Sequence, residues 1–376
     1  MKKINIQLWT QFDKLFSSLK QEDTIAIFHD ADPDGTCSAV LLALAIKKQR
    51  GTPPQLHTAP GSERFLPDET IAFLKTKKVN VLFTTDISLD EHPEQLKKAA
   101  EFARIIVIDH HKLYTDMNAD ADNKNILILK PQLLTEGIDP ARYCSSKLVY
   151  DLCMRQVNIS EKDWVAAVGV ISDMTGEQWQ DFLHAVFKRY HFSTRNSTKS
   201  SDWFDTRIGM ISKIISSAEV YDSKNVDLCF DTLAKAESPR DIFASELVRF
   251  EKEVSAEIKK FLNALNNDAE FYDDAELVYY HINPRLNIKS PLCTLASLNY
   301  PDKTVMVVSV SNGRAHVSAR RQDKKVAVND LCEEACRNFL DSNAGGHKQA
   351  AGATFPAHYL DKFKKYVITI LEKRKI

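Results

Sequence analysis

The sequence predicts an α/β protein with a mainly parallel N-terminal sheet, linking helices and a smaller α/β domain at the C-terminus. Short apolar runs rich in β-branched residues alternate with stretches of helical periodicity through the first half of the chain. This alternation is typical of parallel sheets with helical crossovers. The 376 residues are enough for two domains of ordinary size. We expect one domain over residues 1–178, a helical insertion or linker over 179–272, and a second domain over 273–376.

Four apolar runs are expected to form buried strands of the N-terminal sheet because of their length and β-branching. They cover residues 24–28, 79–84, 105–108 and 126–129. Helical patterns lie at residues 36–46, 68–77, 92–103, 146–157 and 161–171. Residues 185–205 mix basic, aromatic and turn-forming side chains without clear periodicity, and we expect a loop or insertion there.

A long helix and a second set of strands are expected in the last third of the chain. Apolar residues recur at three- and four-residue steps over residues 238–267, which predicts one long helix. Apolar or alternating runs then predict strands, and amphipathic patterns predict helices. The strands are expected at residues 277–282, 304–310 and 315–320, and the helices at 327–341 and 357–373.

Composition excludes several classes of protein. The formal net charge is −1, so a nucleic-acid partner would have to be met by a local basic patch. Hydrophobic residues make up 44% and charged residues 27%, which excludes wholesale disorder. No apolar run reaches the roughly 18 residues of a membrane span, and we expect a cytoplasmic protein without a membrane partner. The seven cysteines include no CxxC pair, so neither a disulfide framework nor a zinc knuckle is indicated.

Acidic and histidine side chains follow three of the predicted strands, and one more acid follows a predicted helix. In parallel sheets, the carboxyl ends of the strands meet at one edge, so these side chains should lie close together. Carboxylate oxygens suit Mg²⁺ and Mn²⁺, and imidazole nitrogen suits Mn²⁺ as well. The candidates are His29, Asp30, Asp32, Asp34, Asp86, Asp109, His110, His111 and Asp173.

The spacing within these clusters favours a pair of metal ions. Asp32 and Asp34 are two residues apart, so one loop can offer a carboxylate to each of two ions, and Asp86 can bridge ions roughly 3.5–4 Å apart. Gly35 lets the backbone turn close to the ions. Each cluster alone also fits a turn, a helix cap or a solvated strand end. Together, they predict a two-metal phosphoesterase.

These motifs resemble the DHH phosphoesterase superfamily with its DHH-associated C-terminal domain. Asp109-His110-His111 is similar to the motif that names the family, Asp32 and Asp34 to its first motif, Asp86 to its second and Asp173 to its fourth. The resemblance covers nearly the whole chain apart from about residues 180–270. It implies a catalytic domain, a substrate-binding DHH-associated domain and an active site in the cleft between them. Either His29 or Asp30 would complete the first motif.

The resemblance also implies roles for the site residues. It implies hydrolysis of a phosphodiester by a metal-activated water at two Mn²⁺ ions, with Mg²⁺ as a substitute. The metal ligands would be Asp32, Asp34, Asp86, His110 and Asp173, together with His29 or Asp30. Asp109 would orient a ligand histidine, and His111 would face the substrate. The segment 344–353 resembles the family's glycine-rich phosphate-binding turn, and the implied substrate-binding residues are Ser318, Arg320, Gly345, Gly346 and His347.

Three functions fit this resemblance. The first is an exonuclease on single-stranded DNA, RNA or short oligonucleotides that releases nucleoside monophosphates, and the basic and aromatic residues of 185–205 would then contact the strand. An ordinary segment whose aromatic residues pack on the core is the alternative for that stretch. The second function is a phosphodiesterase for cyclic dinucleotides or nanoRNA. The third is a non-enzymatic replisome scaffold, as among RecJ-like proteins, with replication or repair proteins as partners. Strand polarity, sugar preference and oligomeric state are left open.

Overall fold

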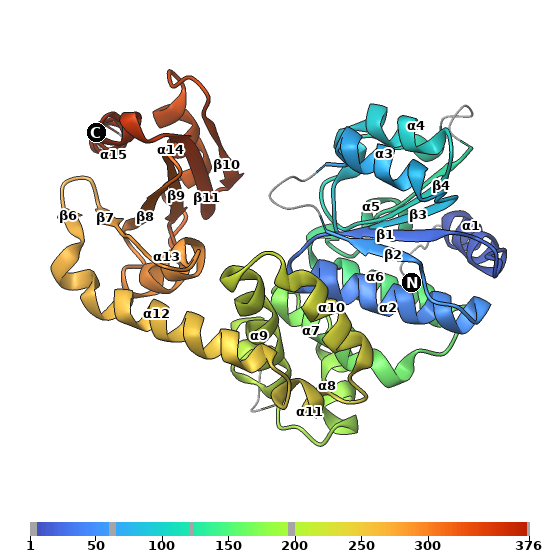
Figure 1. Cartoon of the computed structure of the whole chain (residues 1–376). Coiled ribbons are helices and arrows are strands. Elements are labelled where there is room, and N and C mark those ends of the chain that lie inside the picture. The colour runs from blue at the N-terminus through green and yellow to red at the C-terminus, as the bar shows by residue number, and fades with distance from the viewer. Residues whose placement is uncertain (1–5, 60–64, 120–123, 195–199, 374–376) are drawn as a thin grey trace. The chain divides into compact units, whose positions relative to one another are not determined.

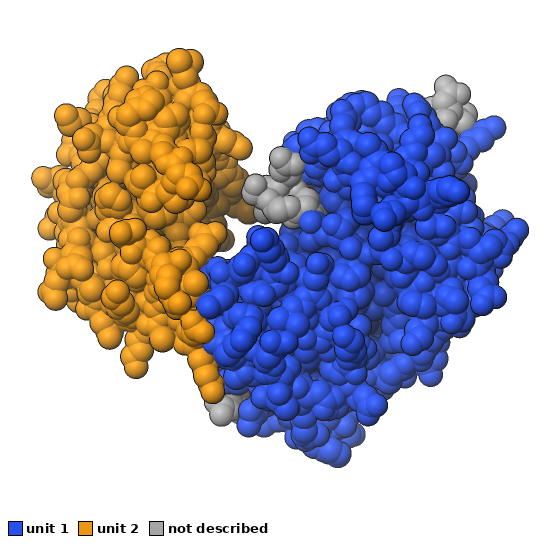
Figure 2. All heavy atoms as spheres, viewed as in Figure 1, with its two compact units in different colours: residues 1–251 blue, residues 252–376 orange. Residues whose placement is uncertain are grey.

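The computed structural model describes residues 6–59, 65–119, 124–194 and 200–373. Its contacts divide the chain into two compact units, residues 1–251 and 252–376, which Figure 2 colours separately. The chain passes from one unit to the next within helix α12 (Leu247–Asp268). Residues 179–251, which the sequence predicts to be part of an insertion or linker, belong to the first unit in the structure.

The first unit contains a five-stranded sheet that is parallel throughout, as predicted, in the order β2-β1-β3-β4-β5. Its pairing register aligns the last residues of the four longer strands in one row. The residues that follow these strands therefore lie side by side at one edge. The strands are β1 (Ile25–His29), β2 (Leu56–Thr58), β3 (Val81–Thr85), β4 (Arg104–Ile108) and β5 (Ile126–Leu129).

Helices cover both faces of this sheet (Figure 1). Alternate strand residues face two separate apolar cores, with Phe83 in one and Leu82 in the other. Helices α3 (Asp68–Thr76) and α4 (Pro93–Ala100) lie on one face, and α2 (Pro33–Arg50) and α6 (Ser145–Met154) lie on the other. Helix α2 is buried along nearly its whole length, as its almost unbroken apolar sequence predicts.

Further helices complete the first unit, and two of the predicted segments differ in the structure. The stretch 185–205 is not wholly a loop, because α8 continues to Arg189 and buries Phe187, and Trp203 is also buried. The helical spacing of its buried residues Val186 and Phe187 is visible only together with Leu183, which precedes this stretch. The predicted helix over 238–267 is interrupted at residues 244–246. The helices are α1 (Ile6–Ser17), α5 (Pro131–Leu134), α7 (Asp163–Ser172), α8 (Gln180–Arg189), α9 (Arg207–Tyr221), α10 (Asn225–Lys235) and α11 (Pro239–Phe243).

The second unit is built on a six-stranded mixed sheet in the order β10-β11-β9-β8-β7-β6. Only β7 and β8 pair in parallel. The glycine-rich segment expected as a turn is instead the strand pair β10 and β11. The strands are β6 (Glu270–Tyr272), β7 (Leu277–His281), β8 (Thr304–Ser311), β9 (Arg314–Arg320), β10 (Asn343–His347) and β11 (Ala350–Pro356).

Three helices pack on this second sheet. Helices α14 (Val328–Cys336) and α15 (Leu360–Lys373) share an apolar core with one face, to which β9 contributes Val317. Helix α13 (Lys289–Asn299) packs on β8 and β9 from the other face, where its Cys293 thiol contacts the Ser318 carbonyl at 3.2 Å. The side chains of β9 that point toward α13 are therefore separated from the main core.

The cysteines and the lengths of the helices are two further features of the chain. All seven cysteines are free thiols and all are buried. Among the helices of the described ranges, none combines the length and apolar character that crossing a membrane requires.

Candidate metal centre

The predicted acidic and histidine side chains converge at the carboxyl edge of the parallel sheet. Three groups each place ligand atoms within 4.8 Å of one another, among the described residues. Asp86 belongs to two of the groups and His110 to two, so the three form one continuous cluster. The groups are Asp30, Asp32 and Asp86; Asp86, His110 and His111; and Asp34, His110 and Asp173.

The first loop is shaped by tight packing between β1 and α2. Asp32 caps α2, and its Oδ1 accepts a hydrogen bond from the Gly35 amide at 2.9 Å. A Cβ atom on Gly35 would lie 2.4 Å from the Asp30 carbonyl oxygen, so a larger residue would push the loop away from the cluster. The need for glycine here agrees with the prediction that the backbone turns closely at this position.

The start of helix α6 holds two of the carboxylates in place. The amides of Ser145 and Ser146 donate to the two oxygens of Asp34 at 2.8 and 3.0 Å, and the Ser145 hydroxyl donates to Asp86 at 2.8 Å. These amides have no partner within their own helix, so a carboxylate suits them. Sequence analysis missed both serines because the contacts to Asp34 are made by backbone atoms, which have no signature in the sequence.

A fully buried ion-pair network supports the Asp109-His110-His111 segment. Asp109 contacts the His111 Nδ1 atom at 2.7 Å through one oxygen and the Lys130 amine at 2.8 Å through the other. Lys130 also pairs with Asp90 at 2.5 Å. Burial opposes the charge of Asp109, but the hydrogen bond from His111 and the charges of His111 and Lys130 hold its pKa below the ordinary value. Lys130 directly follows β5, and the sequence pattern does not reveal it because a lysine at a strand end is not a metal ligand.

The electrostatics of the cluster favour bound cations. Burial and neighbouring aspartates raise the pKa of Asp32 to about 7 and that of Asp173 to about 9, and they raise the pKa of Asp86 well above its ordinary range. The Nδ1 atom of His110 and one oxygen of Asp173 are buried, have no hydrogen-bond partner and lie 3.7 Å apart. Buried polar atoms are normally satisfied, so orphaned acceptors beside crowded carboxylates fit divalent metal ions.

His29 and Asp30 are the two candidates for the remaining ligand of the first motif, and the structure places them in different surroundings. Asp30 belongs to one of the three groups, whereas His29 belongs to none of them. The His29 ring is fully buried, with its centroid 6.2 Å from that of Phe230, and burial lowers its pKa to about 4. Its Nδ1 atom lies 2.7 Å from the Asp30 carbonyl oxygen. We therefore propose Asp30, the one of the two that belongs to a group, as the ligand.

The predicted substrate-binding residues lie on two strands of the second unit, β9 and β10, which flank β11. Strand pairing aligns Gly345 with Gly352 and Gly352 with Ser318. The next aligned row runs from His347 through Ala350 to Arg320, while Gly346 lies between the two rows with a positive φ of 132°. The Arg320 guanidinium donates to the hydroxyls of Ser290 and Thr294 on α13 at 3.0 and 3.2 Å. The five residues thus share one region of this sheet.

Divalent cations should stabilise the folded chain, because they would relieve repulsion that the unfolded chain does not have. At about a hundredfold excess of free ion over its Kd, the free energy of unfolding should rise by about 2.7 kcal/mol.

The raised pKa values of Asp32 and Asp173 mean that the ion-free fold holds protons that the unfolded chain releases. The stability of the ion-free fold should therefore be lost as pH rises from about 4 to about 9. Thermal unfolding with Mn²⁺, Mg²⁺ or NaCl of equal ionic strength measures the effect of the ions. Thermal unfolding of the ion-free chain across this pH range measures the effect of pH. A Tm that does not respond to divalent ions would contradict this assignment.

Comparison with known proteins agrees with this architecture. The DHH family N-terminal domain matches residues 24–173, and the DHHA1 domain matches residues 294–373. None of the curated protein sequences matches the chain.

Several solved structures share the fold at low sequence identity. RecJ from Thermus thermophilus in complex with Mn²⁺ is 16% identical with a TM-score of 0.69, over 98% of this chain and 54% of that one. This chain therefore spans about half the length of that RecJ. An exonuclease RecJ bound to manganese is 16% identical with a TM-score of 0.68, over 96% of this chain and 94% of that one. CDC45 from Entamoeba histolytica is 12% identical with a TM-score of 0.55, over 96% and 99%.

Each family match falls within one of the two units described above. The DHH match begins before β1 and ends at Asp173, so it contains every residue of the three groups. The DHHA1 match contains Ser318, Arg320 and the β10–β11 pair. The chain therefore belongs to the DHH phosphoesterase superfamily and combines an N-terminal DHH domain with a C-terminal DHHA1 domain.

Proposed function

We propose that this chain is a Mn²⁺-dependent phosphodiesterase that acts as an exonuclease on single-stranded DNA, RNA or short oligonucleotides and releases nucleoside monophosphates. The convergence of mutually repelling carboxylates, among them the buried Asp34 and Asp86, with His110 at one sheet edge carries this proposal. Such a cluster has no evident role in stabilising the fold, since its charges oppose one another.

Six side chains would hold the ions: Asp30, Asp32, Asp34, Asp86, His110 and Asp173. Asp86 and His110 each belong to two of the three groups, so they connect the groups into one continuous site. When bound, Mn²⁺ or Mg²⁺ would polarise the phosphoryl oxygens and lower the pKa of water. The α6 amides that contact Asp34 and the Ser145 hydroxyl that contacts Asp86 would keep these carboxylates oriented.

His111 would serve the departing oxygen of the substrate. Asp109 holds its Nδ1 atom at 2.7 Å, which fixes the orientation of the ring. The Nε2 atom is then the one that would donate a proton to the leaving oxygen. Because Lys130 holds Asp109 from the other side, the proton-donating group rests on a rigid, buried support.

The DHHA1 residues would bind the phosphate groups of the strand. Arg320 suits bidentate contact with phosphate oxygens, and its hydroxyl partners Ser290 and Thr294 keep it extended along α13. Gly345 and Gly352 carry no side chain beside Ser318, so a phosphate could approach the backbone of that row closely. His347 would add a further donor.

Two alternatives differ from this proposal in substrate or in catalysis. A phosphodiesterase for cyclic dinucleotides or nanoRNA would use the same metal centre with a smaller substrate. A replisome scaffold is suggested by the fold that this chain shares with CDC45, and it would make replication or repair proteins the partners. The complete set of clustered ligands favours catalysis, because a scaffold has no use for repelling buried acids.

One assay separates the three functions. The purified chain with Mn²⁺ is offered end-labelled DNA and RNA of graded length, together with cyclic dinucleotides, and parallel reactions contain Mg²⁺ or EDTA. We expect stepwise release of mononucleotides from single strands with Mn²⁺ and none with EDTA. Exclusive hydrolysis of dinucleotides would support the first alternative, and an inert protein would support the scaffold.

A further inference from the structure

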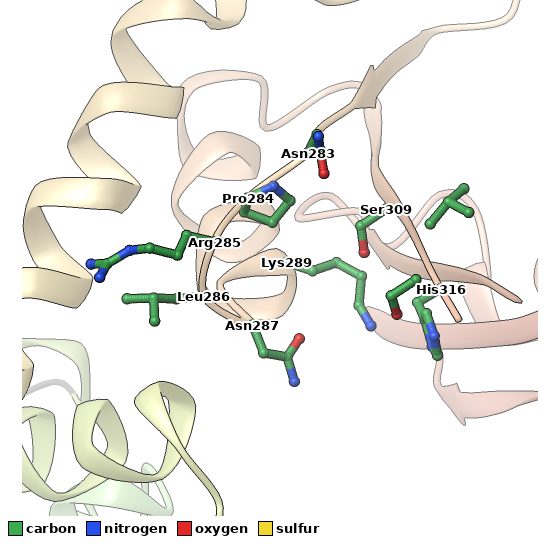
Figure 3. A pocket seen from close by; sticks show the side chains of 10 residues that line it. Asn283, Pro284, Arg285, Leu286, Asn287, Lys289, Ser309 and His316 are labelled. Atoms are coloured by element: carbon green, nitrogen blue, oxygen red, sulfur yellow. The ribbon is translucent and has the colours of Figure 1, made fainter. Parts of the chain in front are cut away.

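A polar pocket of about 360 Å³ lies in the second unit, outside the residues assigned so far (Figure 3). It is enclosed by the loop after β7, the start of α13 and the neighbouring ends of β8 and β9. Its volume falls in the range of small-ligand sites, roughly 300–1,000 Å³. None of the ten residues that line it is acidic, and its polar side chains are those of Asn283, Arg285, Asn287, Lys289, Ser309, Ser311 and His316.

Lys289 supplies the uncompensated charge of this pocket. Its side chain is half-buried and runs toward His316 (Figure 3), and no described residue gives its amine a hydrogen bond or an ion pair. Burial lowers the pKa of Lys289, and the nearby positive charge of Arg320 lowers it further. A partly buried cation without a counter-charge is costly unless an anion binds beside it.

The second cation of the pocket is already neutralised. Arg285 points away from Lys289 toward α12 in Figure 3, where it pairs with Glu253 at 3.0 Å and Glu257 at 3.5 Å. Burial and the charge of Lys289 lower the pKa of His316, so its ring is a neutral hydrogen-bonding group. One positive charge among neutral polar groups matches the single negative charge of an internal phosphodiester better than a doubly charged terminal phosphate.

The pocket continues the row of phosphate-binding candidates on β9. His316, Ser318 and Arg320 alternate along the strand and therefore point to the same face, the one on which α13 packs. Four residues of strand span roughly 13 Å from His316 to Arg320. Two neighbouring residues at the start of α13 face the two ends of this row. Ser290 accepts a hydrogen bond from Arg320, and Lys289 points toward His316 (Figure 3).

We propose that this pocket binds an internal phosphodiester of a linear single strand, beyond the nucleotide held by Ser318, Arg320 and the β10–β11 glycines. The inference rests on the proposed function and specifies its substrate. A linear strand longer than a dinucleotide can fill both positions at once, whereas a cyclic dinucleotide cannot extend along the face. Long strands should therefore bind more tightly than dinucleotides.

Binding of fluorescent oligonucleotides to the full chain tests this inference. Anisotropy is measured in EDTA, so that no strand is hydrolysed, with a dinucleotide and a hexanucleotide and with Lys289→Gln, Lys289→Arg and Lys365→Gln. Lys365 is an exposed lysine on α15, on the opposite side of the sheet, and matches the charge change. We expect Lys289→Gln to weaken hexanucleotide binding on the order of tenfold and to leave dinucleotide binding nearly unchanged. Lys289→Arg should retain most of the affinity.

Salt dependence gives a readout that a local packing defect would not change. Loss of one phosphate contact should make the slope of log affinity against log salt shallower by about 0.7 for a single strand. Equal losses for both lengths, an unchanged slope, or an equal effect of Lys365→Gln would overturn the inference. Hydrolysis is assayed separately with Mn²⁺. If the chain binds strands through Lys289 but does not cleave them, only the proposed function is contradicted. If the chain cleaves strands but Lys289→Gln binds them as tightly as the original chain, only this inference is contradicted.

Discussion

The Asp173→Asn variant is expected to lose Mn²⁺-dependent hydrolysis by about 10³-fold or more in kcat/KM while its ion-free fold keeps its stability. Ion binding at a site of this kind supplies several kcal/mol of transition-state stabilisation, and each 1.4 kcal/mol is about a tenfold change in rate. Burial and the charges of Asp34 and Asp32 raise the pKa of Asp173 to about 9, so its ion-free carboxyl is protonated near neutral pH. Asparagine closely matches that protonated group, and the free energy of unfolding should change by less than about 1 kcal/mol.

Two further variants separate catalysis from folding. Asp34→Asn should lose both activity and stability, because the Ser145 and Ser146 amides donate to different oxygens of Asp34 and asparagine has only one oxygen, and an unsatisfied buried donor costs about 1–3 kcal/mol. Glu177→Gln removes an acid four residues after Asp173 that lies outside the three groups, and it should change neither property. Steady-state kinetics and denaturant unfolding in EDTA measure the two effects. Full activity in Asp173→Asn would exclude that carboxylate from the metal centre.

The parallel sheet and the cluster of acids and histidines at its edge could be predicted because each depends on local sequence patterns. Apolar β-branched runs determine where strands end, and parallel pairing then brings the residues that follow them to one edge. The choice between His29 and Asp30 could not be made in the same way. His29 is still part of β1 and its side chain enters the core, whereas Asp30 follows the strand. Whether a residue is the last of the strand or the first after it depends on where strand pairing ends. The sequence pattern does not give that position to within one residue.

Contacts made by backbone atoms or by distant residues were the ones that sequence analysis missed. The α6 amides that hold Asp34 belong to Ser145 and Ser146, more than a hundred residues away in the chain. Strands β10 and β11 contain glycines of low β propensity, so the segment resembles a turn until pairing with β9 is known. Tertiary pairing, rather than local preference, determines the structure at these positions.

The Lys130→Met variant is expected to be destabilised by about 3–5 kcal/mol and to lose most of its hydrolytic activity. Lys130, Asp90 and Asp109 are all fully buried, and Lys130 lies 2.5 Å from Asp90 and 2.8 Å from Asp109. Removing the cation leaves the buried Asp90 carboxylate without a counter-charge and leaves Asp109 with His111 alone, which is the costly way to break a buried ion pair. Asp109 should then take up a proton or move, and in either case it no longer holds the His111 ring in one orientation.

Lys162→Met is the matched control because Lys162 is also a buried lysine, but its amine donates only to backbone carbonyls, among them those of Leu233 and Ala236. The same substitution there leaves buried carbonyls without a donor but no uncompensated carboxylate beside the cluster, so it should cost stability and spare kcat. The double variant of Lys130→Met with Asp90→Asn completes a double-mutant cycle with the single Asp90→Asn variant. If the network acts as one unit, the second substitution should recover part of the lost stability, because one uncompensated charge is removed. Activity should stay low, because Asp109 still lacks its cation. Recovery of kcat along with stability would instead mean that Lys130 supports only the fold and does not position His111.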